Sequence, residues 1–137
     1  MNETKMYTYY PCITSHAFPI MVQDQYMMSN LRNALTLIRQ AVSGEREDEL
    51  FYDCLIGEAP SDDDKKIIES IRNDERKHFK MFREIYYELT GQMLPPPTDT
   101  GFDRPGPYIE GIQKALFGEL GAVERYRQIL FGMQSSY

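Results

Sequence analysis

The sequence lacks long hydrophobic runs and has an excess of acidic over basic residues. No stretch of its 137 residues approaches the roughly 18 consecutive apolar residues of a membrane span, so we expect none. The N-terminus has no basic region followed by an apolar run, which argues against a secretory signal. With 15 Lys and Arg against 21 Asp and Glu, the net charge is −6, and such a surface repels nucleic-acid phosphates. We therefore expect a cytoplasmic protein that binds neither membranes nor nucleic acids.

Cysteine is also scarce. Cys12 and Cys54 lie far apart and belong to no CxxC pair. A rubredoxin-type iron site or a zinc ribbon needs four thiolates, or thiolates with histidines, at short spacing, so both are excluded. We interpret the two cysteines as reduced thiols of a cytosolic protein.

The chain length allows one domain, and its 42% apolar content suffices for a core. Three segments have apolar residues at steps of three and four, the period of amphipathic helices. They cover residues 29–56, 61–90 and 107–132. Ser61 has the character of an N-cap, because Asp62, Asp63 and Asp64 follow it. Residues 1–28 show no sustained period, so we expect an irregular N-terminal arm before a helical domain at 29–137.

The two connections between these helices differ in length. The first is so short that the first two helices are expected to be antiparallel neighbours. The second, residues 91–106, contains three consecutive prolines and at about 3.1 Å per residue reaches about 50 Å, longer than the roughly 42 Å of a 28-residue helix. It can return along the bundle and start the third helix parallel to the second. A hairpin followed by a long crossover is typical of an all-α, ferritin-like bundle.

Each expected helix carries a glutamate within its apolar stripe: Glu45, Glu75 and Glu119. An unpaired buried carboxylate costs several kcal/mol, so these positions need a compensating partner. The midpoint of Glu45 and Glu75 is residue 60, in the turn, while Glu75 and Glu119 lie 14 and 12 residues beyond the starts at 61 and 107. The three acids and His78 therefore fall in one layer. Carboxylates with an imidazole favour a divalent first-row metal.

This arrangement resembles the ferritin-like superfamily, and within it the rubrerythrin-type di-iron carboxylate proteins. The resemblance rests on three motifs: Gly44-Glu45-x6-Tyr52, Glu75-x2-His78 and Gly118-Glu119-x6-Tyr126. It implies two bound iron ions, or manganese, and a ferroxidase- or peroxidase-type activity.

The resemblance also implies a role for each motif residue. Glu45 and Glu119 would be terminal ligands, Glu75 would bridge the metals, and His78 would bind one of them. Tyr52 and Tyr126 would orient these carboxylates from beside the site.

The sequence departs from the rubrerythrin pattern in several ways. Ala122 stands where rubrerythrins have a further glutamate, the rubredoxin domain is absent, and a fourth helix with a second Glu-x-x-His is missing. Either the chain is part of a longer polypeptide, which we favour, or two chains each contribute half of a site.

Three amphipathic helices leave an apolar groove, so we expect a homodimer or higher oligomer. The candidate contact residues are Phe79, Phe82, Tyr86 and Phe131. The alternative function is a metal-free, degenerate helical bundle whose acids form salt bridges and whose groove binds partner helices.

Overall fold

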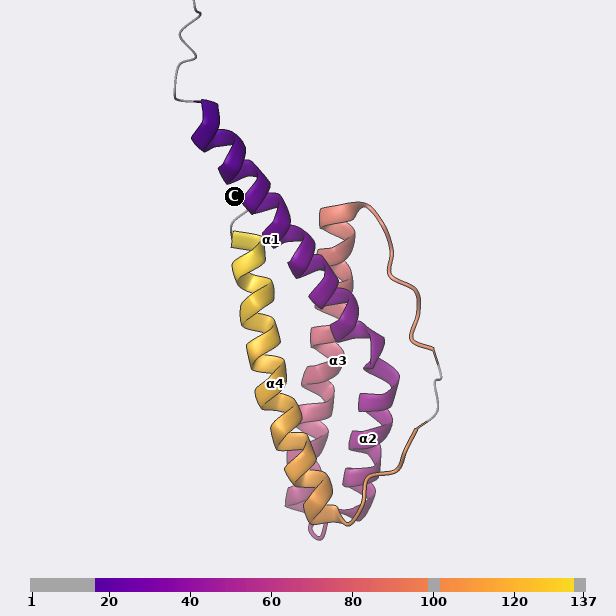
Figure 1. The fold of residues 1–137 in the computed structure, drawn as a ribbon. Helices are drawn as coiled ribbons and strands as arrows, with labels where there is room; N and C mark the ends of the chain where they lie inside the picture. Colours follow the sequence, from indigo (N-terminus) through magenta and orange to yellow (C-terminus); the bar gives the residue numbers. More distant parts are fainter. Residues whose placement is uncertain (1–16, 99–101, 135–137) are drawn as a thin grey trace, which may run out of the picture.

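The computed structural model describes residues 17–98 and 102–134, and these residues are built from α-helices without any strand (Figure 1). The helices are α1 (Ala17–Ser43), α2 (Glu45–Glu58), α3 (Asp62–Thr90) and α4 (Tyr108–Gln134). The expectation of an all-α bundle is confirmed. None of the helices in the described ranges has the length and apolar character needed to cross a membrane.

The first helix begins earlier than expected and is broken in its middle. Because α1 starts at Ala17, the expectation of an irregular arm is wrong for residues 17–28, while residues 1–16 lie outside the described ranges. Pro19 lies in the first turn, where backbone N–H groups have no intrahelical partner to lose. The break between Ser43 and Glu45 falls at Gly44, the residue type that stabilises a helix least after proline. Figure 1 shows α1 turning away from the line of α2 at this point.

α3 starts and ends where its local sequence predicts. The Ser61 hydroxyl accepts a hydrogen bond from the Asp64 N–H at 3.1 Å, and the three aspartates at 62–64 face the positive end of the helix dipole. Gly91 ends the helix with φ 68°, a left-handed conformation that favours glycine, and its N–H donates to the Tyr87 carbonyl. The short connection at 59–61 makes α2 and α3 antiparallel neighbours (Figure 1).

The crossover between α3 and α4 returns the chain to the end of the bundle where α3 began, so α4 runs parallel to α3 (Figure 1). The Arg83 guanidinium donates to the Pro95 carbonyl at 2.7 Å, and Arg104 pairs with Glu58 at 2.6 Å. These bonds hold the described parts of the crossover against α3 and α2.

The core consists of two clusters separated along the bundle. One, near the α2–α3 turn, contains Tyr52, Leu55, Ala59 and Ile68. The other contains Ile38, Tyr86 and Ile129 and joins α1, α3 and α4. Phe79 and Tyr86 are only 3% and 5% exposed, so the expectation that they contact a second chain is wrong. These two side chains lie seven residues apart on the face that α3 turns toward its own bundle.

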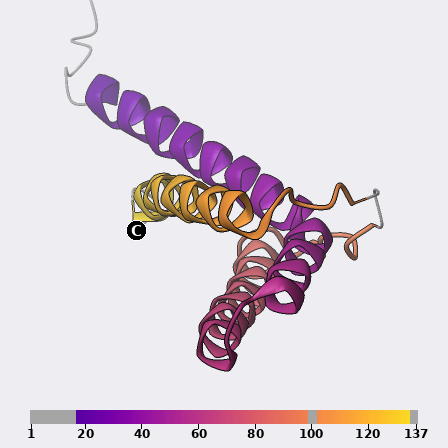
Figure 2. The ribbon, with the colours of Figure 1, turned by 90° about the horizontal axis from the view of Figure 1, so that it is seen from below.

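α3 and α4 are the one pair of described helices whose backbones do not pack together. They meet only through long side chains: the Tyr126 ring lies edge-on to His78 and tilted against Phe82. Figure 2 shows α4 between α1 and the α2–α3 pair. One side of α3 and one side of α4 are therefore left without a neighbouring helix.

Candidate metal centre

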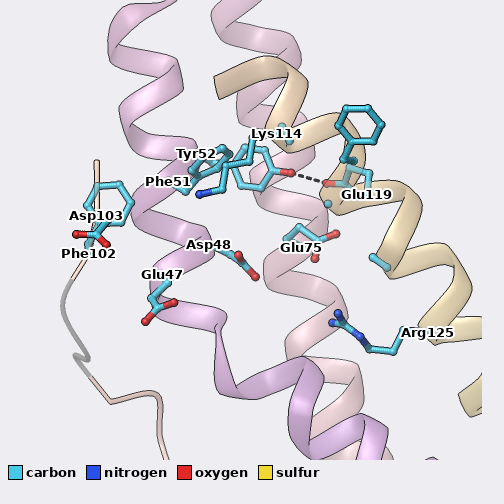
Figure 3. A pocket seen from close by; sticks show the side chains of 14 residues that line it. Glu47, Asp48, Phe51, Tyr52, Glu75, Phe102, Asp103, Lys114, Glu119 and Arg125 are labelled. Atoms are coloured by element: carbon cyan, nitrogen blue, oxygen red, sulfur yellow. Dashed lines mark hydrogen bonds between the residues drawn. The ribbon is translucent and has the colours of Figure 1, made fainter. Parts of the chain in front are cut away.

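A cavity of about 710 Å³ opens between α2 and α4, and residue Glu75 of α3 is part of its lining (Figure 3). Apolar side chains, among them Phe51 and Phe102, line part of it. Its charged lining residues are Glu47, Asp48, Glu75, Asp103, Lys114, Glu119 and Arg125. Acids from three helices thus surround one space.

Glu119 is held by a tyrosine from another helix. Its Oε1 accepts a hydrogen bond from the Tyr52 hydroxyl, which links α4 to α2 across the cavity (Figure 3). Burial raises the pKa of Tyr52, and the hydrogen bond to Glu119 and its negative charge raise that pKa further. The phenol therefore keeps its proton and acts as a donor at neutral pH.

Glu75 lies between His78 of its own helix and Tyr126 of α4. Its side chain is 12% exposed, and its Oε1 lies 3.0 Å from His78 Nδ1. The Tyr126 hydroxyl donates weakly to Oε2 over 3.5 Å, and burial together with the charges of Glu75 and Glu119 raises the pKa of Tyr126. His78 is outside the cavity lining but adjoins it through Glu75, and its Nε2 takes no part in the Glu75 bond.

Glu45 does not face the large cavity. Arg83 donates to Glu45 Oε2 from two nitrogens, at 2.9 and 3.1 Å. Glu45 and Glu75 instead line a separate, smaller cavity of about 170 Å³. The structure thus brings Glu75 and Glu119 to one cavity, and ties Glu45 to Arg83 of α3, which is outside the lining of that cavity.

Asp48 stands in the large cavity where Glu45 was expected. It follows Glu45 by three residues, and its N–H bonds the Gly44 carbonyl at 2.9 Å, so it begins the helical bonding of α2 just after the break. Sequence reasoning missed it because Glu45 falls in the apolar stripe of an unbroken helix. The signal that points to Asp48 is its spacing of one helical turn from Glu45.

The folded protein disfavours the charged form of the Asp48 carboxylate. Although the residue as a whole is exposed, its carboxylate lies toward the cavity (Figure 3). Desolvation, with the negative charges of Glu75 and Glu47, raises the pKa of Asp48 from 3.8 to about 6, and Arg125 opposes this rise. The cavity therefore concentrates negative charge that a cation would relieve.

The donor types suit a divalent metal, whereas their present spacing does not hold one. Across residues 17–98 and 102–134, no three or more His, Cys, Asp or Glu side chains are close enough together to bind a metal ion. Hard carboxylate oxygens with an imidazole nitrogen are the ligands that iron(II) and manganese(II) accept. To bind, the side chains of Asp48, Glu75 and Glu119 have to converge on the cavity.

Comparison with known proteins adds one relative. No protein-family model matches the chain, and no solved structure matches it. The uncharacterized protein YhjR of Bacillus subtilis (strain 168) is 29% identical over 121 residues, which cover 88% of this chain and 73% of that protein. The name of that protein assigns no activity, and the geometry of the cavity is what bears on function here.

Proposed function

We propose that this chain is a metal-binding protein of the ferritin-like, rubrerythrin type, and that it binds divalent iron in the acidic cavity between α2, α3 and α4. One observation carries the proposal: carboxylates from three helices surround the same cavity, where desolvation, together with the negative charges of neighbouring acids, raises the pKa of Asp48 to about 6. A bound divalent cation neutralises the negative charge of such a cluster, whereas water in the cavity does not.

Asp48, Glu75 and Glu119 would supply carboxylate oxygens, and His78 would supply an imidazole nitrogen. Tyr52 and Tyr126 keep their protons and direct two of these carboxylates by hydrogen bonds. Bound iron supplies the change of oxidation state with which such a protein oxidises Fe(II) or reduces oxygen or peroxide. The same carboxylate and imidazole donors would also accept manganese. A complete site of this type would hold two ions.

A metal-free bundle is the second candidate, and the α2–α3 contact favours it. Three arginines of α3 pair with acids of α2: Arg83 with Glu45, Arg76 with Glu49, and Arg72 with Asp53. These pairs explain why α2 is acidic on the side that faces α3. They do not explain the acids at positions 48 and 119, which face the large cavity between α2 and α4.

The metal content of purified protein separates the two candidates. Protein prepared without chelator and soaked with Fe(II) under nitrogen should retain about one or more ions per chain, measured by elemental analysis. Glu119→Gln and His78→Ala should each weaken binding by about 10-fold or more, as loss of a ligand does. Glu88→Gln, an exposed acid of α3 outside the cavity, is the matched control and should bind as the wild type does. Wild-type protein without metal after the soak would favour the metal-free bundle.

A further inference from the structure

α4 carries a row of exposed apolar side chains beside its buried face. These residues are between 50% and 64% exposed: Ile109, Leu116, Leu120, Val123 and Leu130. Their steps of seven, four, three and seven residues keep them on one side of the helix. Single exposed apolar residues are ordinary on protein surfaces, but a row along a whole helix marks an interaction site.

α3 carries a similar row. Ile67, Ile71 and Met81 are 61%, 36% and 53% exposed, and they lie on the same side of α3 as His78. Because the backbones of α3 and α4 do not pack together, neither row is covered by the other helix. The two rows together form the uncovered face of the molecule.

The row on α4 is nearly symmetrical about its own centre. Ile109 and Leu130 each lie 10.5 residues from the midpoint between residues 119 and 120, and Leu116 and Val123 each lie 3.5 residues from it. Leu120 lies half a residue from that midpoint. An antiparallel copy of α4 therefore places Leu116 opposite a second Val123, and Ile109 opposite a second Leu130. Such self-complementarity is what a two-fold interface between identical chains requires.

The exposed apolar area also matches what a stable dimer buries. The eight side chains of the two rows each offer on the order of 100 Å², which amounts to roughly 800 Å² per chain, the area that each partner contributes to a standard interface. Binding of a short peptide or of a single helix from another protein does not require a symmetrical α4 row, so the symmetry favours a second copy of this chain.

We infer that the uncovered face binds a second copy of this chain, with the two α4 helices antiparallel and the two-fold axis passing near Leu120. Glu119 is next to that axis, so the two acidic cavities lie on either side of it. If the proposed metal binding holds as well, the second copies of Glu75 and His78 would be the source of the carboxylate and imidazole that one chain lacks. The dimer itself does not depend on that condition.

Sedimentation equilibrium of the full chain tests the inference. The wild type should be a dimer at high micromolar concentration, and Leu120→Arg should raise the dissociation constant at least about 100-fold, because it buries two guanidinium groups at the axis. Met93→Arg, at an 84% exposed apolar residue of the crossover, is the matched control and should leave the dimer intact. A monomeric wild type, or a dimer indifferent to Leu120→Arg, would overturn the inference.

Cross-linking keeps the test decisive if Leu120→Arg does not fold. In a chain carrying Cys12→Ser and Cys54→Ser, Leu120→Cys should oxidise to a covalent dimer, because a residue near the axis meets its own copy within disulfide distance. Ile109→Cys alone should not, whereas Ile109→Cys with Leu130→Cys should. If the Leu120→Cys chain or the double variant failed to form a cross-link, the proposed register would be overturned.

Metal content measured on the same samples keeps the two proposals separate. A wild-type dimer that binds no iron contradicts the proposed function and leaves the inferred dimer standing. A monomer that binds iron supports the proposed function and contradicts the inferred dimer.

Discussion

Asp48 shows how the fold changes the chemistry of one residue. Its carboxylate lies in a cavity with Glu75 and Glu119, and Arg125 is the basic group that opposes their effect on its pKa. Tyr52 donates a hydrogen bond to the Glu119 carboxylate, and Tyr126 donates one to the Glu75 carboxylate. Both donors are neutral hydroxyl groups. The folded state thus disfavours the ionised form of Asp48.

This raised pKa makes the stability of the metal-free protein depend on pH through Asp48. The folded state holds a proton on Asp48 up to about pH 6, whereas the unfolded chain releases it near pH 3.8, so this contribution to stability is full below pH 3.8 and is lost as the pH rises to about 6. Asp48→Asn removes this loss of stability at higher pH, because asparagine has no proton to release. We expect the variant to gain about 1 kcal/mol over the wild type between pH 4 and pH 7, because water screens much of the effect at an exposed residue.

Urea unfolding of metal-free wild type and Asp48→Asn at pH 4, 5, 6 and 7 measures this difference. Asp63→Asn, at the exposed start of α3, is a control for loss of one negative charge. A difference between Asp48→Asn and the wild type that does not change with pH would mean that the carboxylate is not destabilised in the fold.

At the scale of helices, close packing of α1 on α4 depends on Gly132. A Cβ atom at this position would lie 2.6 Å from the Asn30 carbonyl oxygen and 2.7 Å from the Ala34 Cβ. Backbone atoms and a Cβ cannot rotate out of the way, so only glycine allows the two helices to approach this closely. α1 is otherwise joined to the bundle through the cluster around Ile38 and Ile129.

Gly132→Ala should therefore destabilise the protein by about 2 kcal/mol, since it forces the two helices apart. Gly121→Ala on the same helix has nothing within 4 Å and is the matched control; it should stabilise by up to about 1 kcal/mol through helix propensity. Free energies of unfolding from urea titrations measure both. Equal effects of the two substitutions would contradict the close contact between α1 and α4.

At the scale of the whole molecule, metal binding and folding should be linked. A ligand that binds only the folded state raises the free energy of unfolding, by about 2.7 kcal/mol at a free concentration of 100 times its dissociation constant. The proposed ligands lie on α2, α3 and α4, so one bound ion ties these three helices together.

We therefore expect Fe(II) or Mn(II), added under nitrogen, to raise the thermal unfolding midpoint of the wild type. Glu119→Gln should lose most of that rise, while its midpoint without metal should change much less. Mg(II) at the same concentration controls for general screening of the acidic surface. An identical rise with Mg(II) would indicate screening of the net charge of −6 rather than a specific site.

Local sequence signals were enough to predict much of the fold. The cap at Ser61 and the stop at Gly91 mark α3 because capping depends on residues adjacent in the chain. Glu75 and Glu119 could be assigned to one level because a helix rises by a fixed amount per residue, about 1.5 Å, which turns spacing into depth. The length of the crossover likewise allowed α4 to run parallel to α3, as Figure 1 shows.

Tertiary structure alone decided which acid faces the cavity. The break at Gly44 rotates α2 relative to α1, so Asp48 points into the large cavity while Glu45 reaches Arg83, a residue 38 positions away. Periodicity identifies the apolar face of an unbroken helix, and it neither locates a break nor shows which arginine of a neighbouring helix lies opposite an acid. Those outcomes depend on how the helices pack, because packing and charge pairing between distant segments select the final rotation of each helix.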